Sequence, residues 1–374
     1  MDIFLLNWKD IKNPEVGGAE VIAFEFARRL VKEGYAVTFF SRNFHGCRDK
    51  EIVDNVTIIR RGNKLSVYLH ALFYYRSLKR KPDIVVDMIN TVCWQTPLYI
   101  PKEKRIAYVN QLAKEVLFYE FIWPISWISY FLEPLEYFSY KTSRVLCYSQ
   151  STKNDLMSFG IPGRKIHVFP LGLDHERYIP GKEKSKHPLF IFVARLVRMK
   201  RGDLCIKAMK AVVEKHPNAR LLLIGNGPDE ERLRNLINDL GLATSIQIIN
   251  KNNFFIDKSP VDIKVRFMQE AWGLVLPSVK EGWGMVVTEA AACGTPSIVS
   301  NVTGLRDSVV DKKTGIILSK QPSSKELANA ISLLIENKKL REKLSLGALQ
   351  WSKEFNWDKS YTRFKHLILA KYEG

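Results

Sequence analysis

The chain has 374 residues, of which 46% are hydrophobic and 26% are charged. This composition excludes a disordered chain, and the length suits two domains of ~100–200 residues better than one. The formal net charge of +18 favours polyanions or anionic membrane surfaces as neighbours, or else reflects a well-solvated lysine-rich surface.

The N-terminal MDIFLLNWKD has no basic stretch ahead of its apolar run, so we expect a first β-strand here and not a signal peptide. The most apolar segment, residues 121–132, contains a proline and is shorter than the ~20 residues that span a bilayer. Five widely spaced cysteines without a CxxC pair indicate a reducing compartment. Cys147 and Cys293 lie in apolar runs and are expected in the core. We therefore expect a cytoplasmic protein that at most binds the inner membrane face.

Short β-rich runs alternate with helical patterns through the first half of the chain. The amphipathic run 19–34 is the first predicted helix. The predicted strands are residues 3–8, 35–41, 56–61, 83–89, 105–110, 144–149 and 165–170. Runs that are apolar on both faces are typical of a parallel sheet covered by helices.

Residues 171–188 interrupt this alternation with glycine, proline and dense charge, and form the best linker candidate. The pattern then resumes, with strands at 189–196, 219–227, 246–250, 272–278, 296–301 and 315–319, and helices near 202–215, 228–241 and 323–372. We predict an α/β protein of two Rossmann-like domains, residues 1–172 and 188–356, whose parallel sheets face a central cleft. In such sheets, ligands bind beyond the carboxyl ends of the strands.

The stretch KEGWGMVVTEAAACGTPS, residues 280–297, follows a predicted buried strand. The strand delivers Glu281 to its carboxyl end, where Gly282 and Gly284 let backbone N–H groups approach a ligand closely. The positive end of the following helix suits phosphate, and Glu289 adds a second carboxylate eight positions further on. The alternative is a capped helix with two incidental surface acids.

Two cations follow the first strand of the second domain, in VARLVRMKRGD. Arg195 leaves the strand end and Lys200 precedes the next helix, so both can reach a diphosphate. There they would do the work of a metal ion by stabilising negative charge on a departing nucleoside diphosphate. Surface solvation is the alternative. The chain has no DxD triplet and its histidines lack ligand spacing, so no metal site is predicted.

Gly17 and Gly18 open the helix after the first strand. Their amides could meet a phosphate, although a plain tight turn is the more common interpretation of such a pair. GNGPDEER, residues 225–232, does not match the dinucleotide fingerprint, so no dinucleotide is predicted.

Four motifs, GGAE (17–20), VARLVRMK (193–200), LLLIGNGP (221–228) and EGWGMVVTEAAACGTP (281–296), resemble those of the large family-4 retaining glycosyltransferases with the GT-B fold. The resemblance covers nearly the whole chain in the right order. Its most specific part is the pair of glutamates with seven residues between them.

The resemblance implies a role for each of these residues. Glu281 would hold hydroxyls of the donor sugar, and Glu289 would hold the ribose hydroxyls of the nucleotide. Arg195 and Lys200 would bind the diphosphate. The donor-binding loop would comprise Gly282, Trp283, Gly284, Met285 and Val286, with the amides of Gly284 and Met285 on the diphosphate.

The resemblance also implies how the domains divide the work. Gly17 and Gly18 would touch the phosphates from an N-terminal acceptor-binding domain, and the C-terminal domain would bind the donor. The last helix, 357–372, would return to the first domain. Transfer would retain the anomeric configuration without a metal or other cofactor, through same-face attack assisted by the donor phosphate.

This chain departs from the family pattern at three places. Many relatives have a histidine where it carries Asn110 and Gln111. An amide can hydrogen-bond a sugar hydroxyl but cannot take a proton at neutral pH, so Asn110 is a candidate sugar contact. Trp283 replaces the usual phenylalanine, and the unusual segment 251–267 lies where relatives hold the base.

Aromatic residues crowd the segment 116–141. It could dock on an anionic bilayer or receive a lipid-linked acceptor. We favour a pair of helices packed on the domain core, with the aromatics as filling.

We predict an enzyme that moves a sugar from a nucleoside diphosphate sugar to a hydroxyl of a glycan, a lipid-linked acceptor or a small polyol. One alternative is an NDP-sugar 2-epimerase of similar two-lobed fold, which would need further acid–base carboxylates and histidines. The other is a basic nucleic-acid-binding protein. The charge allows it, but RRM, KH and zinc signatures are absent from the sequence, so no nucleic-acid partner is expected.

Overall fold

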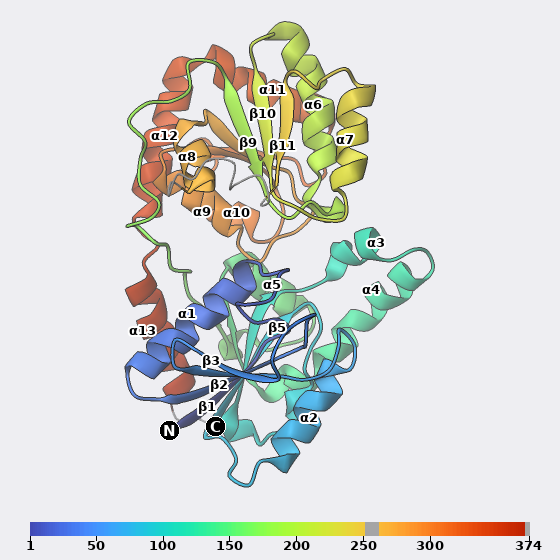
Figure 1. The fold of residues 1–374 in the computed structure, drawn as a ribbon, viewed down its shortest axis with the longest axis vertical. Coiled ribbons are helices and arrows are strands. Elements are labelled where there is room, and N and C mark those ends of the chain that lie inside the picture. Colours follow the sequence, from blue (N-terminus) through green and yellow to red (C-terminus); the bar gives the residue numbers. More distant parts are fainter. Residues whose placement is uncertain (251–261, 371–374) are drawn as a thin grey trace. The chain divides into compact units, whose positions relative to one another are not determined.

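The structure is a computed structural model that describes residues 1–250 and 262–370 (Figure 1). The chain divides into two compact units. Unit 1 comprises Met1–Lys114, Trp127–Pro170 and the chain from Asp358 on, and unit 2 comprises Glu115–Ser126 and Leu171–Trp357. Each unit is built on one mainly parallel sheet, so the predicted α/β class with two parallel-sheet domains is confirmed.

The sheet of unit 1 has the strand order β3-β4-β2-β1-β5-β6-β7-β8. Its strands are β1 (Asp2–Leu6), β2 (Ala36–Ser41), β3 (Lys50–Val53), β4 (Val56–Arg60), β5 (Ile84–Asn90), β6 (Arg105–Gln111), β7 (Arg144–Cys147) and β8 (Ile166–Val168). Every pairing is parallel except that of β3 with β4. Strand β3 was not predicted; it forms a hairpin with β4 through Asp54 and Asn55, both with positive φ. Two such residues between strands are a hairpin signal.

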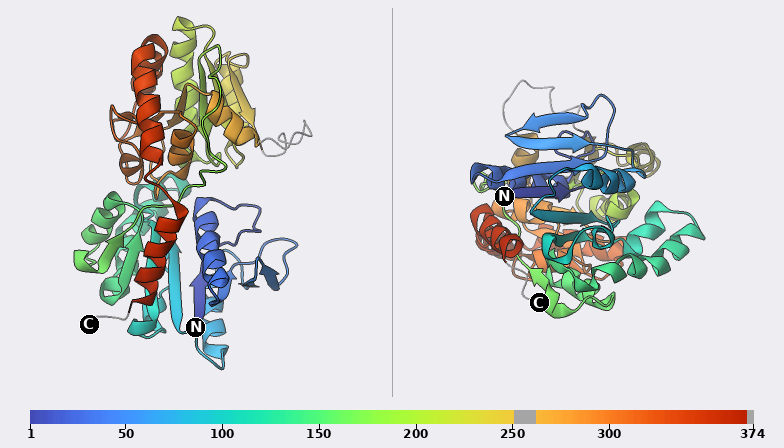
Figure 2. Two further views of the ribbon diagram at one scale, coloured as in Figure 1. Left: turned by 90° about the vertical axis from the view of Figure 1, so that its left-hand side faces the viewer. Right: turned by 90° about the horizontal axis from the view of Figure 1, so that it is seen from below.

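The helices of unit 1 include α1 (Gly18–Lys32), α2 (Val67–Ser77), α4 (Ile125–Glu136), α5 (Gln150–Ser158) and α13 (Trp357–Leu369). The last helix packs beside α1, as both views in Figure 2 show. The ring of Phe364 stacks on that of Phe26, with centroids 4.2 Å apart. The Arg144 guanidinium donates to the carbonyl oxygens of Leu367 (2.7 Å) and Ala370 (2.9 Å). The C-terminal helix thus supplies core and hydrogen bonds to the unit that contains the N-terminus.

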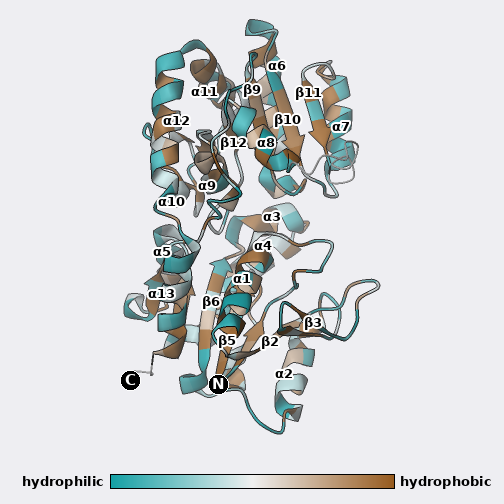
Figure 3. Ribbon diagram, turned by 60° about the vertical axis from the view of Figure 1, so that its left-hand side comes forward, coloured by the Kyte–Doolittle hydropathy of each residue, from teal (hydrophilic) through white to brown (hydrophobic). Residues whose placement is uncertain are grey.

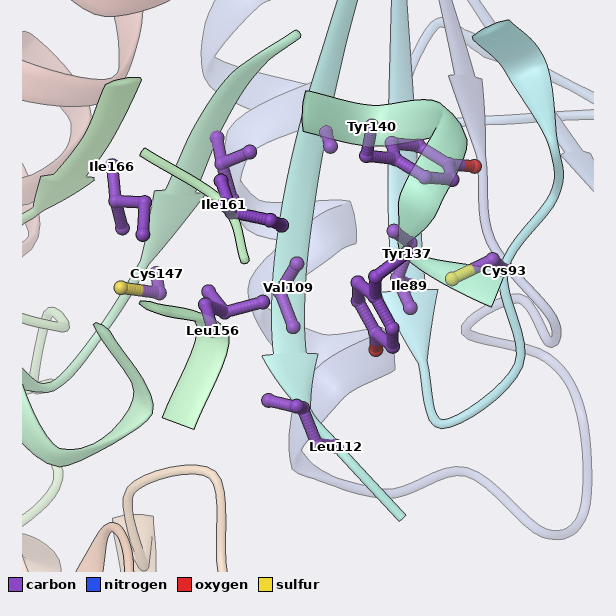
Figure 4. Close-up of a cluster of buried hydrophobic side chains, with 12 residues drawn as sticks. Ile89, Cys93, Val109, Leu112, Tyr137, Tyr140, Cys147, Leu156, Ile161 and Ile166 are labelled. Atoms are coloured by element: carbon purple, nitrogen blue, oxygen red, sulfur yellow. The ribbon is translucent and has the colours of Figure 1, made fainter. Parts of the chain in front are cut away.

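Part of the core of unit 1 lies between the sheet and α5. Figure 4 shows Val109 of β6, Cys147 of β7 and Leu156 of α5 in one cluster with Tyr137. Cys147 is fully buried, and Cys293 in unit 2 is 1% exposed. Both cysteines are therefore core residues, as predicted.

One buried acid in this unit is not explained by apolar packing. Asp87 on β5 is fully buried, and its Oδ2 accepts hydrogen bonds from the hydroxyls of Thr96 (2.7 Å) and Tyr140. Burial raises the pKa of Asp87 to about 6, although these hydrogen bonds oppose the shift. Ionised Asp87 is therefore a cost to the folded state at neutral pH.

This cost predicts how stability depends on pH. The folded-state pKa lies above the unfolded value, so the contribution of Asp87 is fully present below about pH 4 and is lost as the pH rises through about 6. Relative to wild type, Asp87→Asn should gain ~3 kcal/mol in free energy of unfolding between about pH 4 and pH 8. Urea unfolding at both pH values measures this difference.

Asp83→Asn is the control with the opposite sign. The backbone N–H of Asp2 donates to Asp83 at 2.7 Å and lowers the pKa of that carboxyl. The variant should therefore lose stability relative to wild type as the pH rises. A pH-independent difference between Asp87→Asn and wild type would contradict the assignment of Asp87.

The sheet of unit 2 is wholly parallel, with the order β11-β10-β9-β12-β13-β14. Its strands are β9 (Leu189–Val193), β10 (Arg220–Ile224), β11 (Ile246–Ile249), β12 (Gly273–Leu276), β13 (Ser297–Ser300) and β14 (Gly315–Leu318). Figure 3 colours β9, β10 and β11 predominantly brown, the hydrophobic end of its scale. The chain builds outwards from β9 to β11 on one side and from β12 to β14 on the other. The pair β9/β12 is therefore the topological switch point, where open α/β sheets bind ligands.

The helices of unit 2 are α3 (Leu117–Glu120), α6 (Gly202–Lys215), α7 (Glu230–Asp239), α8 (Ile263–Glu270), α9 (Met285–Ala292), α10 (Leu305–Ser308), α11 (Ser324–Glu336) and α12 (Lys338–Ser352), among the described residues. Residues 115–126, which include α3, were expected in the first domain but belong to unit 2. Glu115 explains why they lie with unit 2, because its carboxylate pairs with Lys320 at 3.0 Å and lies 3.9 Å from Lys280.

Residues 171–188 contain no helix or strand, but they pack on unit 2. His175 bonds to the carbonyl oxygen of Phe355 (2.7 Å), and Lys184 donates to the Thr295 hydroxyl (2.6 Å). Tyr178 is 6% exposed. The predicted linker thus contributes side chains to the second unit.

Candidate active site

The switch point of unit 2 brings together two loops that the sequence analysis treated separately. Strand β9 ends two residues before Arg195, and β12 ends five residues before Glu281. Because β9 and β12 are adjacent and parallel, both loops leave the same edge of the sheet. Backbone hydrogen bonding also joins them, since the N–H of Val279 donates to the carbonyl of Met199 at 2.9 Å.

Lys200 and Glu281 form the central ion pair of this site. Lys200 Nζ lies 2.5 Å from Glu281 Oε1, which also accepts from the Ser278 hydroxyl at 2.9 Å. The two charged side chains are only 13% and 14% exposed. A pair this sheltered interacts more strongly than a surface pair. The predicted cation and the predicted acid are therefore held together by short contacts.

The loop after β13 holds the backbone of Glu281 through a hydrogen bond. The Glu281 N–H donates to the carbonyl of Thr303 at 3.2 Å. Gly304 follows with φ +83°, and a Cβ there would stand 2.4 Å from the carbonyl oxygen of Glu281. Only glycine permits both the left-handed backbone and this close approach. The position of the Glu281 carboxylate is thus set by three loops of one sheet edge.

Helix α9 begins four residues after this acid, at Met285. Its N-cap is Gly284, with φ +85°, and it has no side chain to accept from the first N–H groups of the helix. The first helical residues, Met285 and Val286, are half-buried. A helix N-terminus of this kind suits an anion.

Trp283 does not present its ring to this site. It is 7% exposed and packs edge-on against Phe355, with ring centroids 5.3 Å apart. The indole is therefore a core group, and any ligand contact from this residue comes from its backbone.

Glu289 lies on α9 and is 8% exposed. Its Oε1 accepts from the Tyr178 hydroxyl at 3.0 Å, and its Oε2 pairs with Lys264 Nζ at 2.6 Å. Burial alone would lower the pKa of Lys264, but the Glu289 charge outweighs it and raises that pKa. Burial and the same carboxylate raise the pKa of Tyr178 to about 12. A ligand hydroxyl that binds Glu289 must therefore share the carboxylate with two donors.

Three side chains of the site, those of Tyr178, Lys264 and Ser278, were not predicted from the sequence. Tyr178 lies in the charged stretch interpreted as a linker, and Lys264 belongs to the segment 251–267 that was interpreted only as the place of the base. Of that segment, residues 251–261 lie outside the described residues. Ser278 had a signal, because it sits between a buried strand and Glu281.

Arg195 is exposed, and within the described chain no side-chain hydrogen bond or ion pair is found for it. The structure thus brings Lys200 to Glu281 but pairs Arg195 with neither predicted acid.

The remaining predicted residues lie in unit 1. The N–H of Gly17 donates to Glu20 Oε2 at 2.7 Å, and Lys9 Nζ lies 3.8 Å from the same oxygen. A buried carboxylate thus already caps the helix that Gly18 begins, at the place predicted for a phosphate. An anion there would have to displace Glu20 from this amide.

Asn110 is also engaged within unit 1. It is 4% exposed, its Nδ2 donates to the carbonyl of Ile89 at 3.3 Å, and its Oδ1 accepts from the Tyr148 hydroxyl. Gln111, the next residue, is half-buried and ends β6. Of the two amides that replace the histidine, Gln111 is the more accessible.

Metal-ligating side chains do not gather at these loops. Across residues 1–250 and 262–370, no group of three or more His, Cys, Asp or Glu side chains has an arrangement suited to a metal ion.

Two family models match the chain almost end to end. Residues 16–177 match the model described as Glycosyltransferase Family 4, and residues 175–351 match Glycosyl transferases group 1. The chain belongs to the family-4 glycosyltransferases. Its resemblance to this family, expected from the sequence, is thereby confirmed.

Curated relatives of this family-4 glycosyltransferase are similar over part of their length. The D-inositol 3-phosphate glycosyltransferase of Acidothermus cellulolyticus is 30% identical over 54% of this chain and 47% of the relative. An uncharacterized glycosyltransferase of Methanocaldococcus jannaschii is 29% identical over 60% of this chain and 59% of the relative. The chain thus spans about half the length of the curated relatives it matches.

Solved structures show the same fold at low identity. Sucrose-phosphate synthase from Thermosynechococcus elongatus has a TM-score of 0.77 at 19% identity and covers 98% of both chains. WaaG, a glycosyltransferase involved in lipopolysaccharide biosynthesis, has a TM-score of 0.76 at 14% identity, covering 98% of this chain and all of that one. These neighbours confirm the GT-B fold.

Proposed function

We propose that this family-4 glycosyltransferase moves a sugar, with retention and without a metal, from a nucleoside diphosphate sugar to an acceptor hydroxyl. The Lys200–Glu281 pair at the β9/β12 switch point carries this proposal, because it sets one cation and one hydrogen-bond acceptor beside the free N-terminus of α9. Unit 2 would bind the donor, and unit 1 would bind a glycan, a lipid-linked acceptor or a small polyol.

Each group has a task in the proposed reaction. The bond between the anomeric carbon and the β-phosphate oxygen breaks, and the acceptor oxygen forms its bond to that carbon from the same face. The acceptor proton passes to a phosphate oxygen of the leaving nucleoside diphosphate. Lys200 and the amides of Met285 and Val286 stabilise the charge that develops on this leaving group. Glu281 accepts hydrogen bonds from the sugar hydroxyls, and Glu289 accepts them from the ribose.

Two observations support the donor class and the compartment. The solved structures of Anabaena HepE hold UDP and UDP-glucose, so a uridine nucleotide is the first donor to test. All five cysteines are free thiols, which suits the reducing cytoplasm.

A thermal-shift screen against UDP-, GDP- and ADP-sugars tests the donor. A ligand at 100 times its Kd stabilises the folded state by ~2.7 kcal/mol, so one base should raise the melting temperature clearly more than the others. The stabilising donor is then incubated with acceptor extracts, and the released diphosphate and the glycoside are measured. No stabilisation by any nucleotide sugar would contradict the proposal. Conversion of the donor into an isomeric nucleotide sugar would instead indicate a 2-epimerase.

A further inference from the structure

Helix α4 (Ile125–Glu136) has its polar side turned inward. Glu133 is 3% exposed, and its two carboxylate oxygens accept from the N–H groups of Ala113 and Lys114, both at 2.6 Å. Tyr137, directly after the helix, is fully buried. The helix is therefore held to unit 1 through a carboxylate and a tyrosine.

The opposite side of α4 is apolar and exposed. Ile128, Phe131 and Leu135 are 55%, 67% and 66% exposed, and their spacing of three and four residues puts them on one side of the helix. Leu132 and Phe138 are also exposed. We call Ile128, Phe131, Leu132, Leu135 and Phe138 the outer face of α4. A surface helix normally turns its apolar side to the core and its polar side to solvent. An exposed apolar face of this kind marks a site of interaction with a partner or a membrane.

This arrangement corrects the favoured interpretation of the aromatic segment. Filling of the core is right for Tyr137 and Tyr140, which are 0% and 1% exposed. It is wrong for the outer face of α4. Leucine and phenylalanine give the same sequence pattern whether they face a core or an external apolar phase.

Helix α2 (Val67–Ser77) adds a second exposed apolar stripe in the same unit. Leu69 and Phe73 are 60% and 62% exposed at a spacing of four. The region is linked to α4 through neighbouring residues, because Tyr68 contacts the Trp94 ring (4.9 Å between centroids) and Gln95 donates to the carbonyl of Glu136 (3.0 Å). Figure 1 draws both helices on one side of unit 1.

Positive charge accompanies these apolar faces. Arg76, Lys79 and Arg80 at the end of α2 are exposed, and Lys141 Nζ lies 4.3 Å from the centroid of the Phe138 ring. The sequence ranges of unit 1 hold 28 lysines and arginines against 17 aspartates and glutamates, a formal charge of +11.

An apolar face next to cations complements an anionic bilayer, where apolar side chains enter the headgroup boundary and cations bind phosphates. A second copy would instead bring two strongly positive units together.

We propose that the outer face of α4, together with the Leu69–Phe73 stripe of α2, docks unit 1 on an anionic lipid bilayer. Docking would be peripheral: none of the helices in the described ranges combines the length and apolarity of a membrane-crossing segment. This proposal does not depend on which donor the enzyme uses, and its test needs no turnover.

Flotation with vesicles of neutral phosphatidylcholine, or of phosphatidylcholine with an equal share of phosphatidylglycerol, tests the docking. We expect wild type to float with the anionic vesicles. Its binding to the neutral vesicles should be lower by a factor of about five or more. Phe131→Ser combined with Leu135→Ser should reduce binding to the anionic vesicles by about tenfold, through the loss of inserted apolar side chains. Arg76→Ala combined with Lys79→Ala should reduce it by about tenfold and leave less salt dependence.

Matched controls lie in unit 2. Leu346→Ser removes a leucine that is 69% exposed on α12, and Lys339→Ala with Lys343→Ala removes two exposed lysines. Both should float like wild type, and thermal unfolding shows whether each variant is folded. Equal binding to neutral vesicles, or unchanged flotation of Phe131→Ser with Leu135→Ser, would overturn the proposal. So would a lipid-free dimer that this double variant converts to a monomer, because a second copy would then cover the face.

Discussion

The Glu281→Gln variant is expected to lose sugar transfer by about a hundredfold or more while remaining folded. The carboxylate accepts from Lys200 and Ser278 in the structure, and we propose that it accepts from the sugar hydroxyls of the donor. Glutamine keeps the size of the side chain but replaces one acceptor with a donor and removes the charge. Removing one preorganised hydrogen-bonding group at a reacting centre costs about 10²–10³ in rate, the loss known for a donor of an oxyanion hole. Steady-state turnover with the donor found by thermal shift measures the loss.

The same variant should bind the bare nucleoside diphosphate at least as tightly as wild type. The Lys200 ammonium is partly neutralised by Glu281, whose Oε1 lies 2.5 Å from Lys200 Nζ. Removing that negative charge leaves Lys200 free for the diphosphate. Calorimetric titration with the nucleoside diphosphate therefore separates a sugar contact from general damage to the site, which would weaken both.

Glu336→Gln is the matched control for this substitution. Glu336 also pairs with a lysine at 2.5 Å in unit 2, but it lies 46% exposed on α11 with Lys215 as its partner. It should retain full transfer, because an exposed pair contributes little. Normal transfer by Glu281→Gln would remove the assigned role of that residue.

The strands of both sheets could be predicted because their signal is local. Runs such as Leu189–Val193 are buried on both faces, so they read as continuous apolar stretches, and every predicted strand was found near its expected position. Strand β3 was missed because its burial alternates between exposed and half-buried, and Lys50 and Glu51 give it the appearance of a loop. An edge strand with charged side chains has little apolar pattern to recognise.

The orientation of α4 could not be predicted, for a different reason. Its apolar residues repeat at helical spacing, which shows that one side is apolar but not what that side touches. The position of Glu133 decides it, since this carboxylate caps the N–H groups of Ala113 and Lys114 twenty residues earlier in the chain. Such a long-range polar contact leaves no periodic trace in the sequence.

The candidate site was predictable where parallel strands bring neighbouring loops together. Lys200 and Glu281 are 81 positions apart, and both were expected at the carboxyl ends of parallel strands, where the structure brings them into contact. The rule that parallel strands end at one edge does not apply to residues outside the loops that follow the strands. The contacts of Tyr178 and Lys264 with the Glu289 carboxylate were therefore not predicted. The rule also cannot foresee competition, as when Glu20 takes the N–H of Gly17 that was expected to meet a phosphate.

Loss of both cations of the β9 loop is expected to abolish tight binding of the nucleoside diphosphate. Each charge-assisted hydrogen bond to phosphate contributes ~1.5–3 kcal/mol, so Arg195→Ala with Lys200→Ala should weaken binding by a factor of about 10²–10⁴. Titration calorimetry with the nucleoside diphosphate and with the bare nucleoside measures this. The nucleoside should bind both proteins equally, because it lacks the phosphates.

The two single variants should contribute unequally to this loss of affinity, because Lys200 and Arg195 differ in burial and in their partners. Lys200 is sheltered and tied to Glu281, so Lys200→Ala leaves a half-buried carboxylate facing the diphosphate and should account for most of the effect. Arg195 is exposed and pays a larger entropic cost to order on the ligand, so Arg195→Ala should cost less. Lys215→Ala with Lys338→Ala removes the same charge from sites that are 62% and 77% exposed in unit 2, and controls for net charge. If this control weakens binding as much as the loop variant does, or the loop variant binds like wild type, the diphosphate does not lie on these two cations.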